Sequence, residues 1–518
     1  MSTLTRTGWS RERPLWLVAA VAVFATAVWW RFETLDQRPL WLDEQSTARV
    51  VAASSDLAAL WQTGSSDDYL HPPLAYLGQW LTAHDEQTRF RLRLPSAIAG
   101  LVSIAVLAAL GRLVFDPWTG ILAAGLMALS IYHVDFSQEA RPYMPALAVT
   151  LGQYLALLAW LARGRVRWLV CFATCAVLAL YTYHLALIHV AVAAGVAVAL
   201  ALRIVRSDRD WKPMGVTLAV VALAYVPQLA NLAGFLSSGE AEARHTLALG
   251  PQFLHAVAQR WGSGSGATTL LYEACFFAGM LRIARRRDAS ALALLGWILG
   301  PLVAFAVMPF AKYFDLRFLI SSLPAFFLVV AVGVTGVTRA AAAWASRIGL
   351  AERTADRMTA TLGVVIAVAF VIPAWHVYER FRAAERRCGE FLNHIEILEE
   401  NDRLCADQLV LNSIWVEHQW IVRSLRPVIG IPSETLDRFA GFYRFENGPG
   451  IAIRRSGDHL VAQVEGRLAY RLDPDTPTRF FYRTLGDRTV EFTIDEQGQS
   501  RSLVLTSRGG TARASRER

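Results

Sequence analysis

Charged residues are scarce in this amino-acid sequence. Only 18% of its 518 residues are charged and 54% are apolar, whereas an average soluble protein is about 25% charged. The shortage is uneven, because 52 charged residues fall in the first 377 positions and 42 in the last 141. This composition excludes a disordered chain, a disulfide-stapled miniprotein and a single soluble domain. It predicts an integral membrane part followed by a water-exposed domain.

Cysteine is also rare, and the motifs of nucleotide-binding proteins are missing. Cys171, Cys175 and Cys275 lie within apolar runs and are predicted to be small core residues, and Cys388 and Cys405 have neither C-x-x-C spacing nor a histidine partner at metal-ligand spacing. There is no G-x-G-x-x-G turn and no P-loop. We therefore expect no nucleotide, no obligatory metal and no other cofactor. The net charge of +8 does not indicate nucleic acid, because the arginines stand in short clusters between apolar runs.

Eleven apolar runs are predicted to cross about 30 Å of hydrocarbon. The first, 14–30, follows a basic segment and lacks a small-residue cleavage site, so it is predicted to be a membrane anchor. The uncharged stretch 168–202 is too long for one span and is predicted to fold back near Tyr183–His184. The other runs are 94–111, 117–134, 142–162, 213–239, 261–281, 289–311, 318–338 and 358–377.

The loops between these runs differ in charge on the two sides of the membrane. Loops 163–167, 203–212, 282–287 and 339–357 are rich in arginine or lysine, and the opposite loops hold nearly all the acidic and histidine residues. The positive-inside rule then places the N-terminus in the cytoplasm and the C-terminal domain outside. We expect a multi-pass protein of a plasma membrane, such as the bacterial inner membrane.

Four segments make up the predicted domain organisation. Residues 1–377 form the membrane domain, with a long first outer loop at 31–93, and residues 378–435 form an amphipathic helix and a linker. Residues 436–510 alternate polar and apolar side chains between turn residues, which predicts a small antiparallel β domain. Residues 511–518 are predicted to be a disordered basic tail. The alternating segments are IAIRR, HLVAQVE, RLAYRL, RFFYRTL, TVEFTIDE and RSLVLTS.

Two adjacent carboxylates, Asp43 and Glu44, begin the first outer loop close to the predicted membrane interface. A carboxylate held beside apolar surroundings has a raised pKa and can act as a general base. The alternative is that both residues only cap a juxtamembrane helix.

Cations recur in three separate outer loops. Arginine and lysine side chains there could hold a phosphate group at the interface, because they neutralise its charge and arginine can form two hydrogen bonds with it. The alternative is that they reach lipid headgroups or pair with nearby carboxylates. The candidates are Arg93, Arg141, Lys312 and Arg317, together with His71 in the stiff sequence HPPL.

Four motifs occur in an order that resembles a known family. They are W-x-D-E after the first span, HPPL in the first loop, R-L-P-S before the second span and S-Q-E-A-R-P-Y after the third. Over residues 1–340 the chain resembles the GT-C glycosyltransferases of family 39, which include the protein O-mannosyltransferases and the aminoarabinose transferase that modifies lipid A.

The resemblance implies an inverting transfer of a sugar from a polyprenyl-phosphate donor to a hydroxyl group at the outer face of the membrane. It implies that Asp43 is the catalytic base and Glu44 its acidic neighbour. The acceptor would be a protein, a lipid or a glycan, and the sugar a hexose or a pentose. The residues that would bind the donor phosphate are His71, Arg93, Arg141, Tyr143, Lys312 and Arg317.

The C-terminal segment carries a second resemblance. FAGFY, SGDHLVAQVEG, TRFFYR and FTIDEQGQSRSLVL resemble the small lipocalin-like β domain that is often attached to serine hydrolases. No serine hydrolase motif accompanies it, so we expect an accessory module on the outer surface.

Two other functions remain open at the level of sequence. A secondary transporter needs ionisable residues near the bilayer midplane, and within the predicted spans such charge is almost confined to Glu273. A non-catalytic membrane scaffold would use the outer β domain to bind a partner.

Cys388 and Cys405 are predicted to form a disulfide, because both lie in the polar segment that is expected to face an oxidising compartment. In untreated folded protein neither thiol should react with a maleimide reagent, and both should react after reduction. Labelling of both cysteines without reduction would contradict the prediction.

Overall fold

The structure is a computed structural model of the 518-residue chain. It describes residues 6–37, 40, 42–67, 71–237, 245–247, 249–262, 266–307, 316–348, 351–393, 422–424, 429–446, 448–457, 459–465, 469–482, 489–495, 497–507 and 510–517. The chain divides into two compact units, each described by itself below. The first unit comprises residues 1–234, 251–303 and 316–393, and the second comprises 235–250, 304–315 and 394–518.

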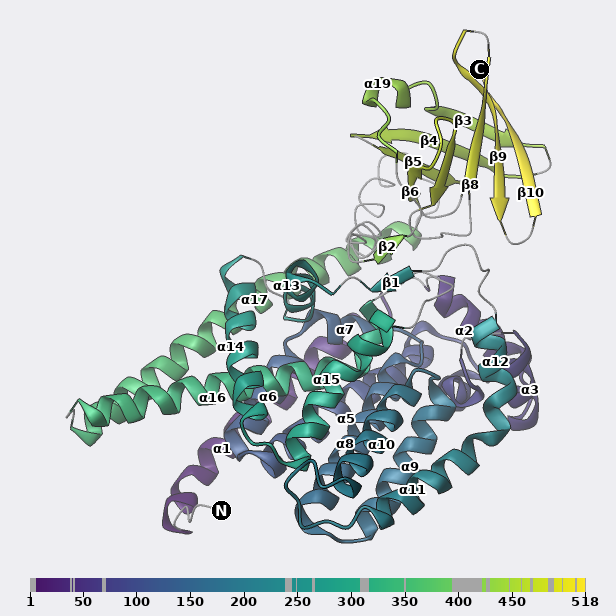
Figure 1. Ribbon diagram of the computed structural model, residues 1–518. Helices are drawn as coiled ribbons and strands as arrows, with labels where there is room; N and C mark the ends of the chain where they lie inside the picture. Colours follow the sequence, from purple (N-terminus) through teal and green to yellow (C-terminus); the bar gives the residue numbers. More distant parts are fainter. Residues whose placement is uncertain are drawn as a thin grey trace. The chain divides into compact units, whose positions relative to one another are not determined.

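The first unit is helical (Figure 1). The helices of the chain up to residue 393 are α1 (Arg6–Phe32), α2 (Leu42–Ala53), α3 (Leu57–Asp67), η1 (Pro73–Ala75), α4 (Leu77–Ala83), α5 (Arg89–Val114), α6 (Pro117–Ala128), α7 (Ile131–Ser137), α8 (Tyr143–Arg163), α9 (Arg167–Thr182), α10 (Ala186–Ala201), α11 (Lys212–Tyr225), η2 (Val226–Gln228), α12 (Leu229–Ser237), α13 (Pro251–Trp261), α14 (Ala267–Ala284), α15 (Ala289–Val307), η3 (Leu316–Ser322), α16 (Leu323–Arg347) and α17 (Glu352–Asn393).

The predicted polytopic membrane fold is confirmed. Among the described residues, eight helical segments are long and apolar enough to cross a membrane, and the bent pair α6 and α7 makes a ninth. Two shorter apolar helices, α9 and α10, occupy the stretch that was predicted to fold back on itself. Together these segments coincide with the eleven predicted runs. Glu273, the charge within the run 261–281, lies 2.7 Å from the Nδ1 atom of His255 on α13.

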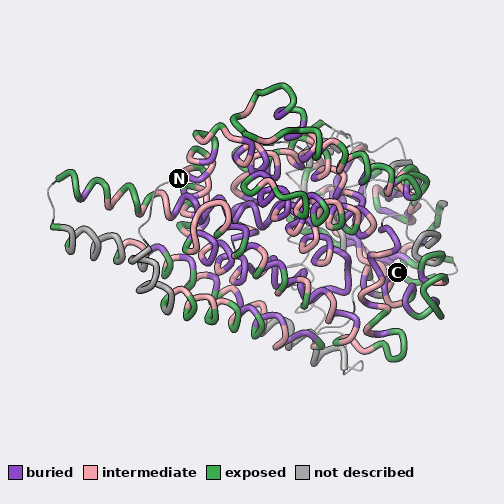
Figure 2. The backbone as a smooth tube through the Cα atoms, turned by 90° about the horizontal axis from the view of Figure 1, so that it is seen from below, coloured by how far each residue is buried: buried purple, intermediate pink, exposed green. Residues whose placement is uncertain are grey.

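Apolar side chains cover the outside of the helical unit as well as its interior. On α1, for example, Leu15, Val18 and Val21 are 64%, 67% and 68% exposed, which suits contact with lipid chains rather than with water. Figure 2 shows the buried residues gathered in the middle of the helical unit. In the span that contains α16, 89% of the residues of its most apolar window are buried, so the first half of α16, Leu323–Val334, lies in the interior of the unit.

Glycines bring α14 and α16 into direct backbone contact. A Cβ atom on Gly333 of α16 would overlap the carbonyl oxygen of Cys275, and one on Gly279 of α14 would overlap that of Val329. Small residues at such crossings allow helices in membranes to pack closely, where van der Waals contact replaces the hydrophobic effect.

The predicted span 117–134 is bent, since α6 and α7 meet at 66°. Ser130 is the N-cap of α7, and its hydroxyl donates a hydrogen bond to the carbonyl oxygen of Trp261 over 2.6 Å. The bend turns α7 so that its C-terminal end leads directly into the segment 138–142. This segment contributes to the candidate site described below.

The second unit contains an eight-stranded antiparallel barrel. Its strands follow the order β10-β3-β4-β5-β6-β7-β8-β9, and its inward side chains form a core of fourteen buried residues that includes Phe439, Tyr443, Phe480 and Phe492. The elements are α19 (Ser433–Leu436), β3 (Gly441–Phe445), β4 (Gly450–Ser456), β5 (His459–Val464), β6 (Ala469–Pro474), β7 (Arg479–Tyr482), β8 (Thr489–Ile494), β9 (Ser500–Ser507) and β10 (Gly510–Arg516), with a separate antiparallel pair of β1 (His245–Leu247) and β2 (Val422–Ser424).

The barrel confirms the predicted small β domain and corrects its end. Residues 511–518 were predicted to be a disordered tail, but 511–516 belong to β10, which pairs with β9 and with β3. The prediction was wrong because the arginines of this strand give it the composition of a disordered basic tail. The strand closes the barrel between β9 and β3, and its residue Ala514 is part of the buried core. Cys405 and the side chain of Cys388 lie outside the described residues.

Candidate functional site

Glu44 and Arg93 form a buried ion pair at one end of the helical unit. The Nε and Nη2 atoms of Arg93 donate to the two carboxylate oxygens of Glu44, each over 2.8 Å. Both side chains are completely buried. The third hydrogen bond of the guanidinium goes to the carbonyl oxygen of Leu35 over 3.0 Å, and the backbone N–H of Ala140 donates to Glu44 over 2.8 Å. The pair therefore joins α2, α5, the segment after α1 and the turn before α8.

Asp43 is the neighbour of Glu44 in the first turn of α2, but its carboxylate remains accessible. The side chain is 29% exposed, and its Oδ2 atom accepts a hydrogen bond from Nη1 of Arg317 over 3.2 Å. Arg317 lies on η3, and its guanidinium carbon is 5.7 Å from the ring centre of Tyr143. Two predicted site residues that are 274 positions apart are thus brought into direct contact.

Arg141 lies on the other side of Asp43. Its Nη1 atom donates to the carbonyl oxygen of Asp43 over 3.1 Å and to the hydroxyl of Thr47 over 3.2 Å. Its Nη2 atom lies 2.5 Å from Nε2 of His71. Since a guanidinium can only donate, Nε2 of His71 is the acceptor and the ring proton is on Nδ1.

His71 is held in its neutral form. The side chain is 5% exposed, and the rings of Tyr143 and Tyr183 lie 6.1 Å and 5.8 Å from its own. Burial lowers the pKa of His71 well below its ordinary value, and the charge of Arg141 lowers it further. A neutral imidazole can accept a hydrogen bond but carries no charge that would neutralise an anion. His71 therefore positions the Arg141 guanidinium and adds no positive charge of its own.

Residues of the S-Q-E-A-R-P-Y segment form hydrogen bonds to several different helices. Gln138 donates to the carbonyl oxygens of Trp30 and Arg31, which are the last turn of α1, and its amide also bonds to Thr34. Ala140 and Arg141 bind the two sides of α2, and Tyr143 begins α8. This segment therefore fixes α1, α2 and α8 relative to one another.

The short helix η3 is anchored from within the helical unit. The indole N–H of Trp297 on α15 donates to the carbonyl oxygen of Ser321 over 2.7 Å, and the hydroxyl of Ser322 donates back to the carbonyl oxygen of Trp297 over 3.1 Å. The ring of Trp297 stacks on Tyr154 of α8 at 4.1 Å. These contacts hold η3, and with it Arg317, beside α8.

The structure brings together most of the residues that the sequence predicts for the site. Asp43, Glu44, His71 and Arg141 are connected by the contacts above, with the further predicted members Arg93, Tyr143 and Arg317. Arg93 forms its ion pair with the buried Glu44, whereas Arg317 contacts the partly exposed carboxylate of Asp43. Lys312 lies outside the described residues.

Three residues of the site were not predicted. Thr47 could have been found from its position four residues after Asp43, on the same face of a helix. Tyr183 was noted only as a turn, and Trp297 carries no sequence signal because its role depends on a backbone carbonyl group 24 residues away. In the part of the chain that the structure describes, no group of three or more histidine, cysteine or acidic residues could hold a metal ion.

Separate families match the helical part and the barrel part of the chain. Residues 70–230 match the family described as dolichyl-phosphate-mannose-protein mannosyltransferase, and residues 425–515 match a domain of unknown function. Comparison with curated protein sequences found no match. The oligosaccharyltransferase of Archaeoglobus fulgidus in its apo form has a TM-score of 0.50 and 13% identity, with 79% of this chain and 60% of that one covered.

The membrane part has a GT-C fold. The resemblance predicted from the sequence is thereby confirmed at the level of the fold. Two other matches are ArnT from Cupriavidus metallidurans in the apo state (TM-score 0.47, 16% identity, 74% of this chain and 77% of that one covered) and AglB from Archaeoglobus fulgidus in complex with an inhibitory peptide and a dolichol-phosphate (TM-score 0.49, 14% identity, 72% and 56% covered). The chain spans less than two thirds of the archaeal enzymes.

Replacement of Arg93 by Met should destabilise the protein by about 3–5 kcal/mol, because it leaves the buried Glu44 carboxylate without its counter-charge. The double variant Arg93→Met/Glu44→Gln should recover part of this loss. Thermal unfolding in detergent, followed by circular dichroism, measures both. Arg91→Met is the matched control: Arg91 is 44% exposed and pairs with Glu86 over 3.3 Å, so its loss should cost less than about 1 kcal/mol. Equal destabilisation by Arg91→Met and Arg93→Met would contradict the assignment.

The free energy of unfolding of the helical unit should decrease as the pH falls from 7 to 5. The pKa of His71 is lower in the folded chain than in the unfolded chain, so the unfolded chain binds the additional proton below about pH 6.5. In His71→Asn, which keeps an acceptor for Arg141, the melting temperature should fall less over this range than in the wild type. His84→Asn, at an exposed histidine beside Asp85, is the control. An unchanged pH dependence in His71→Asn would show that His71 is not the titrating group.

Proposed function

We propose that this chain is an inverting glycosyltransferase, which moves a sugar from a polyprenyl-phosphate donor to a hydroxyl group at the outer face of the membrane. The observation that carries the proposal is the carboxylate of Asp43, which is partly exposed in an otherwise buried cluster of charges and contacts Arg317 of a second segment. The match of residues 70–230 to a family named for a dolichyl-phosphate sugar supports a lipid-phosphate donor.

In the proposed reaction Asp43 is the general base. It takes the proton of the acceptor hydroxyl while the acceptor oxygen forms a bond to the anomeric carbon. The bond between that carbon and the phosphate oxygen breaks, and the electron pair leaves with the polyprenyl phosphate. Because attack and departure occur on opposite faces of the sugar ring, one displacement inverts the anomeric centre.

Arg317 would bind the phosphate that leaves. Its guanidinium is planar and permanently charged, and such a group can bind a phosphate through two parallel hydrogen bonds. A phosphate group carries more charge than a carboxylate, so a bound donor would draw Arg317 away from Asp43. The Asp43 carboxylate would then be released from Arg317 only when the donor is present. Arg141 and Tyr143 lie at the same place, whereas Arg93 and Glu44 would act only by holding the site together.

An apolar recess beside η3 suits the prenyl chain of such a donor. Its walls come from α13, α14, α15, η3 and α16, and Leu319 of η3 stands two residues from Arg317. Aromatic and aliphatic side chains dominate the lining, and Glu273 is its one charged residue among the described part of the chain. The phosphate end of a lipid in this recess would face the segment that carries Arg317.

Asp43→Asn should abolish transfer, with a rate lower by about 10²–10⁴-fold, because the amide cannot accept the proton. The donor that is no longer consumed should accumulate. Mass spectrometry of the polyprenyl-phosphate sugars in lipid extracts would detect this accumulation, and the mass would identify the sugar as a hexose, a pentose or an amino sugar.

The matched control is Asp36→Asn, which removes an exposed carboxylate from the same loop. It should leave the lipid profile as in the wild type. If Asp43→Asn protein is present at normal levels and no polyprenyl-phosphate sugar accumulates, the proposed mechanism is wrong.

A further inference from the structure

A second cluster of charges lies at the opposite end of the helical unit. Nineteen residues of α5 separate Arg93 from Arg112, which corresponds to about 28 Å along the helix axis. Asp116 follows as the N-cap of α6, and it interacts electrostatically with Arg339 of α16 and Arg282 of α14. We call Asp116, Arg282 and Arg339 the far cluster. None of its residues takes part in the proposed transfer.

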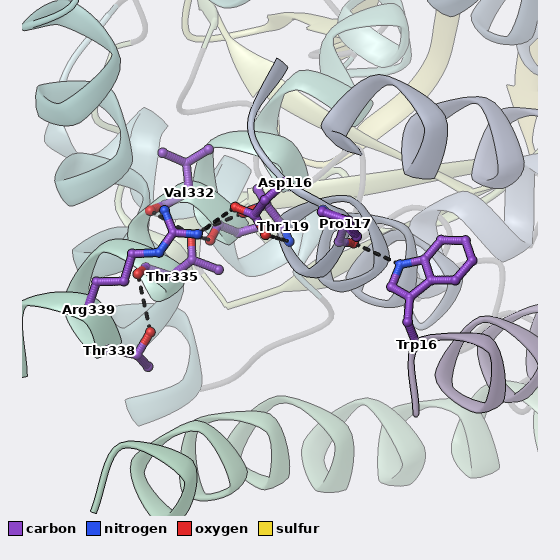
Figure 3. A network of polar contacts seen from close by, with 9 residues as sticks. Trp16, Asp116, Pro117, Thr119, Val332, Thr335, Thr338 and Arg339 are labelled. Carbon is purple, nitrogen blue, oxygen red and sulfur yellow. Dashed lines mark hydrogen bonds and ion pairs between the residues drawn. The ribbon is translucent and has the colours of Figure 1, made fainter. Parts of the chain in front are cut away.

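The single carboxylate of the far cluster is already fully engaged. Its Oδ1 atom accepts from the backbone N–H of Thr119 over 3.0 Å, and its Oδ2 atom accepts from the Thr119 hydroxyl and from Nη2 of Arg339, each over 2.7 Å. Figure 3 shows Asp116 and Arg339 directed toward one another, with Thr119 between their helices. Burial alone would raise the pKa of Asp116, but these hydrogen bonds hold it below its ordinary value. Asp116 is therefore a permanent anion that neutralises one guanidinium.

The second guanidinium of the far cluster lacks such a partner. Within the described part of the chain, no acceptor lies within hydrogen-bond distance of the Arg282 guanidinium, although the side chain is partly buried. Arg339 makes one hydrogen bond with the described residues and so keeps four of its five N–H donors. Two guanidinium groups thus share one carboxylate, and the far cluster carries one uncompensated positive charge.

The backbone of α16 positions Arg282. A Cβ atom on Gly336 would lie 2.8 Å from Nη1 of Arg282, so the guanidinium rests against the backbone of α16 at this glycine and would have to shift if a methyl group were added. Gly336 stands three residues before Arg339 on the same helix, and residues three apart share a face. The two guanidinium groups therefore face the same space between α14 and α16.

We propose that the far cluster binds a phosphate-bearing anion between Arg282 and Arg339, and that this anion is the headgroup of an anionic phospholipid. Arginine pairs bind phosphate well because their planar groups donate parallel hydrogen bonds. The far cluster lies at the end of the membrane spans, at the depth of lipid headgroups, and on the side where the basic loops attract anionic lipids. The bound headgroup would bridge α14 and α16 beyond their glycine crossing.

Native mass spectrometry of the full chain in detergent tests the proposal, with phosphatidylglycerol, phosphatidylcholine and inorganic phosphate added separately. The wild type should bind phosphatidylglycerol at least tenfold more tightly than phosphatidylcholine. Arg282→Gln should reduce phosphatidylglycerol binding by roughly tenfold, which corresponds to one hydrogen bond between charged groups. Arg285→Gln removes the same charge three residues further along, at an exposed position, and should bind as the wild type does.

Gly336→Ala supplies a variant in which every charge is kept. Its added methyl group should displace the Arg282 guanidinium and weaken phosphatidylglycerol binding as Arg282→Gln does. If inorganic phosphate competes with the lipid and its binding is lost in both variants, the cluster recognises the phosphate group. If phosphate binds but the protein shows no preference for phosphatidylglycerol, the ligand is a soluble anion rather than a lipid headgroup. Wild-type affinity for phosphatidylglycerol in both Arg282→Gln and Gly336→Ala would overturn the proposal.

Discussion

The candidate site depends on one completely buried ion pair, between Glu44 and Arg93. Two charges that leave water pay a large desolvation penalty, which is recovered only if every donor and acceptor finds a partner. The surrounding chain meets this demand by placing the carbonyl group of Leu35 and the N–H of Ala140 against the pair. Four segments that are distant in the sequence must therefore meet at one point. The positions of Asp43 and Arg141 follow from this requirement.

Adjacent residues have opposite environments in this arrangement. Asp43 and Glu44 are consecutive in α2, where neighbouring side chains point about 100° apart. One carboxylate is consequently enclosed and satisfied, while the other faces the open side and contacts a single guanidinium. The cations differ in the same way, because Arg93 is completely buried against Glu44 whereas Arg317 contacts the exposed carboxylate of Asp43. Within this cluster, exposure rather than residue type therefore distinguishes the groups that a ligand can reach.

Much of this arrangement could be predicted from residue patterns. Apolar runs and loop charges located the membrane segments, a period of two located the barrel strands, and the outer-loop motifs named most of the clustered residues. Pairing was not predictable, because whether Arg93 contacts Glu44 or a ligand depends on side-chain geometry that spacing does not encode. The anchoring of η3 by Trp297 rests on a backbone carbonyl, which every residue has. Residues 511–516 were misjudged because barrel closure is a property of the whole sheet rather than of its last strand.

The central place of α16 has a consequence for biogenesis. This helix is among the last to be synthesised, yet its buried first half packs against α14 and α6, which are made earlier. The close glycine contact between α14 and α16 cannot form until the residues up to Gly333 have entered the bilayer. Insertion and assembly are therefore separate stages for this chain. The early spans can pack against one another, as α5, α6 and α8 do, but the central helix joins them only late in synthesis.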